Sequence, residues 1–186
     1  MALGSCVMKL DEGRSNSGIE LLEDDKGLFV ERRYLPERLD LTEDEFRLHV
    51  RCAADVGLVH GAAGWEWSNV EDFVLVRNPY VALLEEDDGE EWACYEALLE
   101  RAKQLHLHHG LFIGDAHSKN VCLAKIEGRP QFLIVDGKVG GLTHDADVAW
   151  RRLRVKRRYE MKRYHRWFLD AYLSYIDDIW TRDCQQ

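Results

Sequence analysis

The chain lacks the features that would place it at once in a membrane, a secretory pathway or a nucleic-acid complex. It has no apolar run close to the roughly 20 residues that a membrane-spanning helix requires. Its first residues, MALGSCVMKLDEGR, have no charged start followed by a long apolar stretch, as a secretory signal has. Its net charge of −9 argues against binding nucleic acid, which needs a basic surface. We therefore expect a cytoplasmic protein, with signal-independent export as the open alternative.

Paired cysteines are missing as well. The five cysteines, at positions 6, 52, 94, 122 and 184, show no CxxC pair and no metal-ligand spacing, which favours reduced thiols. Histidines give a weak metal signal, because His106 and His109 are one helical turn apart, with His108 and His117 nearby. No fourth ligand follows at a convincing spacing, so zinc-dependent hydrolysis is the disfavoured alternative.

The residues that are present suit one folded domain, or one domain with two small lobes. Hydrophobic residues make up 46% of the 186 positions, enough for a packed core. Charge is placed unevenly: residues 151–166 contain nine Lys or Arg and one acid, a net +8, which leaves −17 for the rest. This basic segment either neutralises an acidic body or faces an anionic substrate or partner.

The first half of the chain has the pattern of strands around one helix. Thr42 and Glu45 form a T-x-x-E capping box, which predicts a helix that begins there and ends at Gly57. Apolar runs bounded by turn-forming residues predict the strands. The predicted strands cover residues 6–10, 19–22, 28–35, 70–76 and 80–84.

The second half is mainly helical. Apolar residues at three- and four-residue steps predict a helix over 91–107, closed by Gly110. A hairpin with strands 121–126 and 131–135 surrounds the turn EGRP, and one long helical pattern runs on from Asp147. A sheet early in the chain and helices late in it indicate an α+β fold.

The segment 110–137, GLFIGDAHSKNVCLAKIEGRPQFLIVDG, concentrates the residues suited to chemistry. Asn120 stands at the start of the predicted hairpin and Asp136 at its end, so the two should lie side by side. Asp115 lies on the loop just before them. Two carboxylates and an amide form the oxygen-rich kind of site that Mg²⁺ prefers.

This segment resembles the protein-kinase-like superfamily. GDAHSKN matches the G-D-x-H-x-x-N catalytic loop of its aminoglycoside-phosphotransferase-like branch, and Asp136 stands in the place of the DFG aspartate. The resemblance implies that Asp115 is the catalytic base, that His117 shares the catalytic loop, and that Asn120 and Asp136 bind Mg²⁺. More loosely, the chain is similar to small bacterial kinase-like proteins of the PhoP-regulatory-network type and to lipopolysaccharide-core kinases.

The nucleotide-binding half of the resemblance is looser. There is no G-x-G-x-x-G, and EGRSNSG is the nearest substitute for a phosphate-covering loop. The strand FVERRYL offers an arginine where the family has its ATP-anchoring lysine. The predicted cofactor-binding residues are Gly13, Gly18, Arg33 and its helix partner Glu45, with Arg32 and Lys9 as rivals of Arg33.

The resemblance implies a minimal two-lobed kinase-like fold, with a sheet lobe over 1–88 and a helical lobe over 89–186. ATP would lie between them under the acidic segment 84–90, and Mg²⁺ would assist transfer of the γ-phosphoryl group to a hydroxyl of a small molecule, sugar or specialised protein. We expect Arg151, Arg152 and Arg154 to attract an anionic acceptor.

The alternative function is a catalytically weak pseudokinase that acts as a binding module. Ile113 stands where these families usually have histidine, and Gly137 and Lys138 follow Asp136 in place of Phe-Gly. In that case the basic segment 151–166 is the surface for a protein partner.

Overall fold

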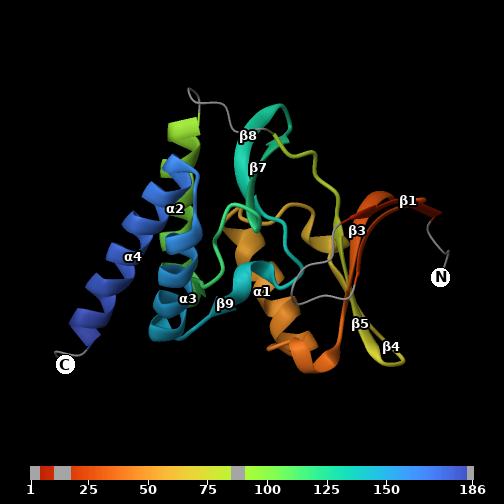
Figure 1. Cartoon of the computed structure of the whole chain (residues 1–186), viewed down its shortest axis with the longest axis horizontal. Coiled ribbons are helices and arrows are strands. Elements are labelled where there is room, and N and C mark those ends of the chain that lie inside the picture. The colour runs from red at the N-terminus through yellow and green to blue at the C-terminus, as the bar shows by residue number, and fades with distance from the viewer. Residues whose placement is uncertain (1–4, 11–17, 85–90, 184–186) are drawn as a thin grey trace.

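The structure, a computed structural model, describes residues 5–10, 18–84 and 91–183. The amino-terminal part is an antiparallel sheet with the strand order β1-β2-β3-β5-β4. Its strands are β1 (Ser5–Leu10), β2 (Gly18–Asp24), β3 (Gly27–Tyr34), β4 (Glu66–Val70) and β5 (Phe73–Pro79). Figure 1 shows this sheet on one side of the molecule and the long helices on the other.

The central strands of the sheet divide their side chains between two faces. Val30 and Tyr34 on β3 are buried, as are Val74 and Val76 on the neighbouring β5. Arg32 lies between Val30 and Tyr34 at the two-residue period of a strand, so it shares their inward face. The hairpin from β2 to β3 turns at Asp24–Gly27, directly before the start of the strand predicted at 28–35.

The bounds predicted for the strands at 70–76 and 80–84 are wrong. The chain reverses at Glu71 and Asp72, between Val70 and Phe73, and Glu71 adopts a left-handed φ of 48°. One predicted strand therefore spans a turn that joins two real ones. The next prediction fails because β5 runs on through Asn78 to Pro79; within 80–84 only Leu83 makes a bridge, to Ala124.

The helix α1 (Glu43–Asp55) begins at the predicted capping box. The Thr42 hydroxyl accepts from the Glu45 amide, and the Glu45 carboxylate accepts from the Thr42 amide at 2.7 Å. Phe46 and Val50 are buried beneath the sheet. The helix thus covers the inner face of the sheet, where β3 and β5 also place their apolar side chains.

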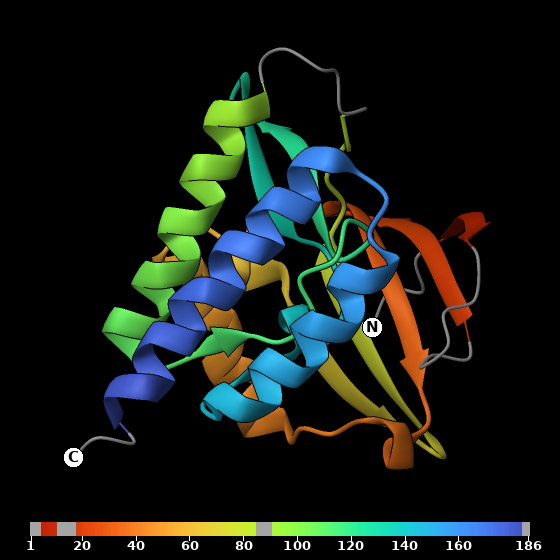
Figure 2. The same cartoon turned by 60° about the vertical axis from the view of Figure 1, so that its left-hand side comes forward.

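The carboxy-terminal part is built from helices and two small antiparallel ribbons. Its helices are α2 (Glu91–His109), α3 (Ala146–Tyr159) and α4 (Arg163–Asp183). Its strands are β6 (Phe112–Ile113), β7 (Val121–Ile126), β8 (Arg129–Ile134) and β9 (Leu142–Thr143), with β6 paired to β9 and β7 to β8. Figure 2 shows α2 and α4 packed side by side. The predicted helix end at Gly110 is confirmed by its φ of +65°.

The prediction of one long helical segment from Asp147 is wrong, because the structure has two helices there. The chain leaves helical geometry at Glu160 (φ −75°, ψ 119°) and resumes at Arg163. Sequence periodicity could not show this break, because Glu160 is fixed by contacts with a distant loop. The early sheet and late helices confirm the α+β prediction. No helix within the described ranges could cross a membrane.

Candidate functional site

The segment that follows β8 folds back onto the loop that follows β6. Val139, Gly140 and Gly141 all have positive φ (51°, 68° and 57°), a conformation that glycine adopts without the strain that a side chain brings. This turn aims its carbonyls at the loop: the Asp115 amide donates to Gly140 O at 2.8 Å. The Asp136 carboxylate accepts from the Gly140 amide. One short turn therefore ties Asp115 to Asp136.

Asn120 joins the same point from the base of the β7–β8 hairpin. Its carbonyl accepts from the Val135 amide at 2.8 Å, directly before Asp136. Its side-chain amide donates to Asp115 O at 3.3 Å, which leaves the Oδ1 atom as a potential ligand. Asp115, Asn120 and Asp136, 21 residues apart in sequence at the extremes, thus lie together in the fold.

The residues at this point fit a magnesium ion shared with a nucleotide. Asn120 and Asp136 offer hard oxygen donors, and Mg²⁺ in such sites typically takes one or two carboxylates and completes its shell with phosphate and water. In the described ranges no group of three or more His, Cys, Asp or Glu side chains could hold a metal without such help. The zinc alternative lacks support, since His106 stacks on Phe112 instead.

Burial raises the pKa of Asp136 to about 6, against the opposing influence of the Gly140 amide and the Arg32 guanidinium. The nearby carboxylate of Asp115 adds to the rise. A carboxylate crowded in this way gains from a cation placed beside it.

His117 lies beside Asp115, with 3.6 Å between Nε2 and Oδ1. Burial lowers its pKa more than the carboxylate of Asp115 raises it. Its Nδ1 accepts from the Lys119 amide at 3.1 Å, so in the neutral ring the proton is on Nε2, on the side of Asp115. A neutral His117 orients the loop and can donate to a ligand near Asp115.

Arg32 and Arg33 point to opposite sides of β3. The Arg32 guanidinium donates to Asn78 Oδ1 on β5 and, at 2.6 Å, to Val135 O, next to Asp136. Arg33 is exposed and lies over the Phe73 ring on the other face. The geometry therefore corrects the choice of Arg33: strand alternation places its neighbour at the site.

Glu45 is also far from the role expected of it. It is exposed at the first turn of α1, and its carboxylate serves the Thr42 cap. The reason is local: a capping box requires Glu45 at the helix end, whereas the side of α1 that faces the core carries Phe46 and His49. Asn78 and the carbonyl of Val135 take up the Arg32 guanidinium instead.

The remaining predicted nucleotide contacts are only partly described. Gly13 and residues 85–90 of the acidic segment lie outside the described residues. Gly18 begins β2, with open space around it. Lys9 pairs with Glu20 in the register of β1 and β2.

The loop that carries Asp115 is held by α3 and α4 through contacts that sequence analysis missed. Glu160 is buried and accepts from the Ser118 amide at 3.0 Å and its hydroxyl at 3.2 Å. His165 is fully buried and contacts Ala116 O through Nε2 at 2.8 Å. Tyr172 accepts from the Ile113 amide at 3.0 Å. The only sequence signal was their position in a helical pattern, which indicates burial and not a partner.

Glu160 is ionised in this setting. Burial by itself would raise its pKa, but the amide hydrogen bonds from Ser118 and Lys162 outweigh it and the pKa is lowered. The Arg166 guanidinium also caps the Glu160 carbonyl, at 2.7 Å. The junction between α3 and α4 thus acts as a fixed clamp on the loop.

The three arginines expected to attract an acceptor do not face the loop in the same way. Arg151 pairs with Asp147 along α3, and Arg154 lies over the Trp150 ring. Arg152 reaches Asp40 at 3.0 Å and packs beside Gly114. Only Arg152 of the three therefore lies near the site.

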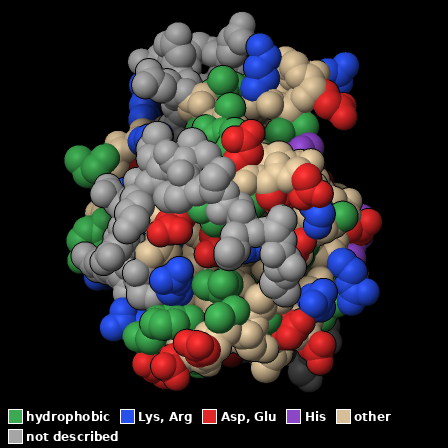
Figure 3. Space-filling model, turned by 90° about the vertical axis from the view of Figure 1, so that its right-hand side faces the viewer, with side chains coloured by type: hydrophobic (Ala, Val, Ile, Leu, Met, Phe, Trp, Pro, Cys, Tyr) green, Lys and Arg blue, Asp and Glu red, His purple; other side chains and the backbone are tan. Residues whose placement is uncertain are grey.

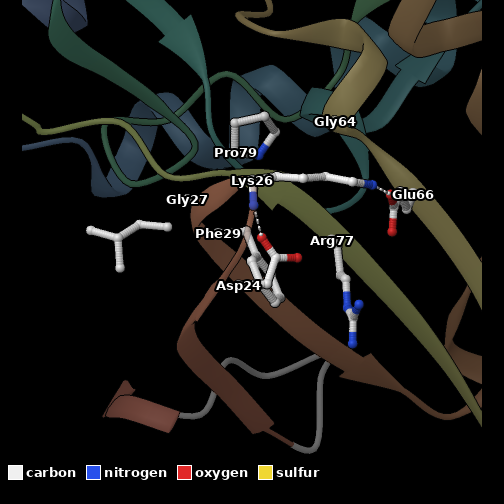
Figure 4. A pocket seen from close by; sticks show the side chains of 9 residues that line it. Asp24, Lys26, Gly27, Phe29, Gly64, Glu66, Arg77 and Pro79 are labelled. Atoms are coloured by element: carbon white, nitrogen blue, oxygen red, sulfur yellow. Dashed lines mark hydrogen bonds and ion pairs between the residues drawn. The ribbon is translucent and has the colours of Figure 1, made fainter. Parts of the chain in front are cut away.

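A small cavity lies elsewhere, at the outer end of the sheet. It measures about 110 Å³ and is lined by residues of the β2–β3 turn and of β3, β4 and β5, including Phe29 and Arg77. Figure 4 shows Lys26 crossing it toward Glu66, while Arg77 points away along the sheet. Its Phe29 and Arg77 belong to the face opposite Arg32, so it is separate from the candidate site. On the described part of the nearby face, charges of both signs are interspersed (Figure 3).

The comparisons with known proteins identify the fold. No protein-family model and no curated protein matches the sequence. Among solved structures, the chain is similar to Rio2 kinase from Chaetomium thermophilum, determined as an ADP/Mg²⁺-phosphoaspartate complex. The TM-score is 0.50 at 15% identity, over 89% of this chain and 60% of the Rio2 chain. The protein has a minimal protein-kinase-like fold; likeness to the aminoglycoside-phosphotransferase branch stays a prediction.

Proposed function

We propose that the protein is an ATP- and Mg²⁺-dependent phosphotransferase that acts on a hydroxyl group. The observation that carries the proposal is the convergence of Asp115, Asn120 and Asp136 through the Gly140 turn. The fold, shared with a kinase solved with ADP and Mg²⁺, supports it. The spans 1–88 and 89–186 are the two lobes in this proposal, with the nucleotide between them.

Each residue has a distinct task in the proposed reaction. Asp115 orients the acceptor hydroxyl and takes its proton, and Asn120 and Asp136 would hold Mg²⁺. When bound, the ion neutralises charge on the nucleotide phosphates. Arg32 takes the role of the ATP-anchoring lysine, a role first expected of Arg33. The reason is that the Arg32 guanidinium lies beside Asp136. An arginine presents two parallel donors where lysine presents a point charge.

The acceptor is a small molecule, a sugar or a specialised protein in this proposal. The clamp formed by Glu160 and His165 holds the loop of Asp115 rigid, which suits catalysis by positioning. The second candidate, a binding module with weak or no transfer, is favoured by the replacement of the anchoring lysine by Arg32 and by Ile113 before Gly114. The two candidates share the nucleotide site and differ in turnover.

The first test measures the thermal shift caused by ATP with and without Mg²⁺, followed by transfer from γ-labelled ATP. A Mg²⁺-dependent shift with release or transfer of label supports the phosphotransferase. A shift without any turnover supports the binding module, and no shift at all overturns both. Because the Rio2 structure contains phosphoaspartate, label on the protein itself should be tested for the hydroxylamine sensitivity of an acyl phosphate.

Asp115→Asn is the matched control for turnover. The amide keeps the size of the side chain but cannot take a proton, so turnover should fall while Mg²⁺–ATP binding is kept. Equal turnover in this variant would remove Asp115 from the mechanism.

A further inference from the structure

One face of α3 runs along the catalytic loop, here residues 114–120. Ala149 and Arg152 pack beside the position of Gly114, Lys156 meets Asp115, and Glu160 meets Ser118. The steps of three and four residues keep Ala149, Arg152 and Lys156 on one side of the helix, and Glu160 follows directly after its last turn. The order along the helix therefore follows the order along the loop, and it brings a lysine to the candidate base.

Lys156 is the basic residue of this segment that contacts Asp115. Its Nζ lies 2.8 Å from Asp115 Oδ1, and its side chain is 35% exposed. Most of the neighbouring cations have other partners. Arg151 pairs with Asp147, Arg152 with Asp40 and Arg157 with Asp170; Arg154 lies over Trp150, Arg163 lies over Tyr164, and Arg166 donates to Glu160 O.

The two oxygens of Asp115 are in different surroundings. Oδ1 has almost no accessible surface and lies between Lys156 and His117. The contact with Lys156 is an ion pair, and Oδ1 accepts no hydrogen bond. The side chain as a whole is 31% exposed, so its open side is that of Oδ2. An incoming hydroxyl can reach Oδ2 without displacing Lys156.

We propose that Lys156 is a catalytic residue that neutralises the phosphoryl group during transfer. An acceptor oxygen bound to Oδ2 lies about 3 Å from it, and the phosphorus is one bond further. An ammonium on the adjoining Oδ1 is within reach of the phosphoryl oxygens. It carries three N–H donors, and among the described residues Asp115 is its one ion-pair partner. The proposal deepens the phosphotransferase function and rests on it.

The step balances without any further reactant. The acceptor oxygen forms a bond to the γ-phosphorus, and the bond from that phosphorus to the β–γ bridging oxygen breaks, with its electron pair leaving on ADP. The acceptor proton passes to Asp115 Oδ2. Lys156 keeps its protons throughout and turns an N–H from Oδ1 toward a phosphoryl oxygen. Fixed charge placed where charge moves during transfer is the part of the site that raises kcat.

The experiment compares Lys156→Met, Lys156→Arg and the control Lys125→Met. Lys125 is exposed on the β7–β8 hairpin, so its loss removes the same charge away from the loop. Water serves as acceptor, and the measurements are kcat and KM for Mg²⁺–ATP hydrolysis. A second measurement is the affinity for Mg²⁺–ADP with and without aluminium fluoride, which imitates the transferring phosphoryl group.

Lys156→Met should lower kcat about 100-fold, leave the KM for Mg²⁺–ATP within about twofold, and remove the gain in affinity that aluminium fluoride gives. Lys156→Arg should restore part of both losses, and Lys125→Met should match the wild type. The proposal is overturned if Lys156→Met binds ADP–aluminium fluoride as the wild type does. It is also overturned if Met and Arg variants lose activity equally with a lowered melting temperature. A wild type that binds no Mg²⁺–nucleotide overturns the proposed function itself.

Discussion

The two walls of the candidate site differ in how they are held. The carboxy-terminal wall, the loop 114–120 with α3 and α4, is fixed by the buried side chains of Glu160, His165 and Tyr172. The amino-terminal wall, formed by β3 and β5, reaches Asp136 through one guanidinium, that of Arg32. The loop is therefore held by several buried hydrogen-bonding side chains, whereas the sheet reaches the neighbourhood of Asp136 through one.

Close packing between the walls is nevertheless strict at one place. A Cβ on Gly137, directly after Asp136, would lie 2.5 Å from the Tyr34 hydroxyl and 3.0 Å from Arg32 Cδ. Within the carboxy-terminal wall, a Cβ on Gly114 would lie 2.8 Å from Gly141 O, a backbone atom that cannot rotate away. Glycine is required at both positions by space.

The largest expected effect is at the point where the walls meet. Asp136→Ala should abolish Mg²⁺-dependent nucleotide binding, a loss of about 100-fold or more, since changes to groups that merely support a metal ligand already cost 10–100-fold. Isothermal titration with Mg²⁺–ADP measures it, and Asp72→Ala, in the exposed β4–β5 turn, is the control. A magnesium-dependent binding curve that is unchanged in Asp136→Ala would contradict the assignment.

The clamp of the carboxy-terminal wall should be the next most sensitive. Glu160→Ala leaves the buried donors of Ser118 without their acceptor. The unfolding free energy should fall by about 2–3 kcal/mol, since buried unsatisfied donors cost about 1–3 kcal/mol each. Urea denaturation measures it, with Glu23→Ala on the exposed side of β2 for comparison. Equal urea midpoints for the two variants would mean that Glu160 does not stabilise the loop.

The amino-terminal wall should respond in ligand binding more than in stability. Arg32→Ala should weaken Mg²⁺–ATP binding about tenfold, as hydrogen bonds to charged groups contribute about 1.5–3 kcal/mol. Arg33→Ala removes the same charge from the outer face and should stay within about twofold. If Arg33→Ala weakens Mg²⁺–ATP binding more than Arg32→Ala does, the face of β3 that carries Arg33 is the one that faces the site.

The smallest effect is a pH dependence at Asp136. Protons and Mg²⁺ compete for its carboxylate, whose pKa is raised by burial to about 6. The sign follows: affinity for Mg²⁺–ADP is nearly full at pH 7, falls to about half near pH 6 and goes on falling below it, by about fourfold in all between pH 7 and pH 5.5. Titration over this range in one buffer series measures it. An affinity that is flat down to pH 5 would place the carboxylate pKa at its ordinary value.

The sequence predicted the carboxy-terminal wall far better than the amino-terminal one. The β7–β8 hairpin is short and local, and its turn lies at Glu127 and Gly128, inside the predicted EGRP turn. A hairpin necessarily brings Asn120 and Asp136 together, so that half of the site followed from neighbours in sequence. In contrast, the choice between Arg32 and Arg33 depended on which face of β3 met the core.

Local sequence by itself determined the α1 cap, the hairpins, the helix end at Gly110 and the adjacency of Asn120 and Asp136, because each is fixed by residues a few positions apart. Only the tertiary structure decided that Arg32 faces the site, that Glu160 interrupts the last helical segment, and that Lys156 meets Asp115. These depend on contacts between residues 41 or more positions apart in the chain. No local pattern predicts such contacts, since the sequence pattern around a charged helix residue is the same whether its side chain lies in water or beside a buried carboxylate.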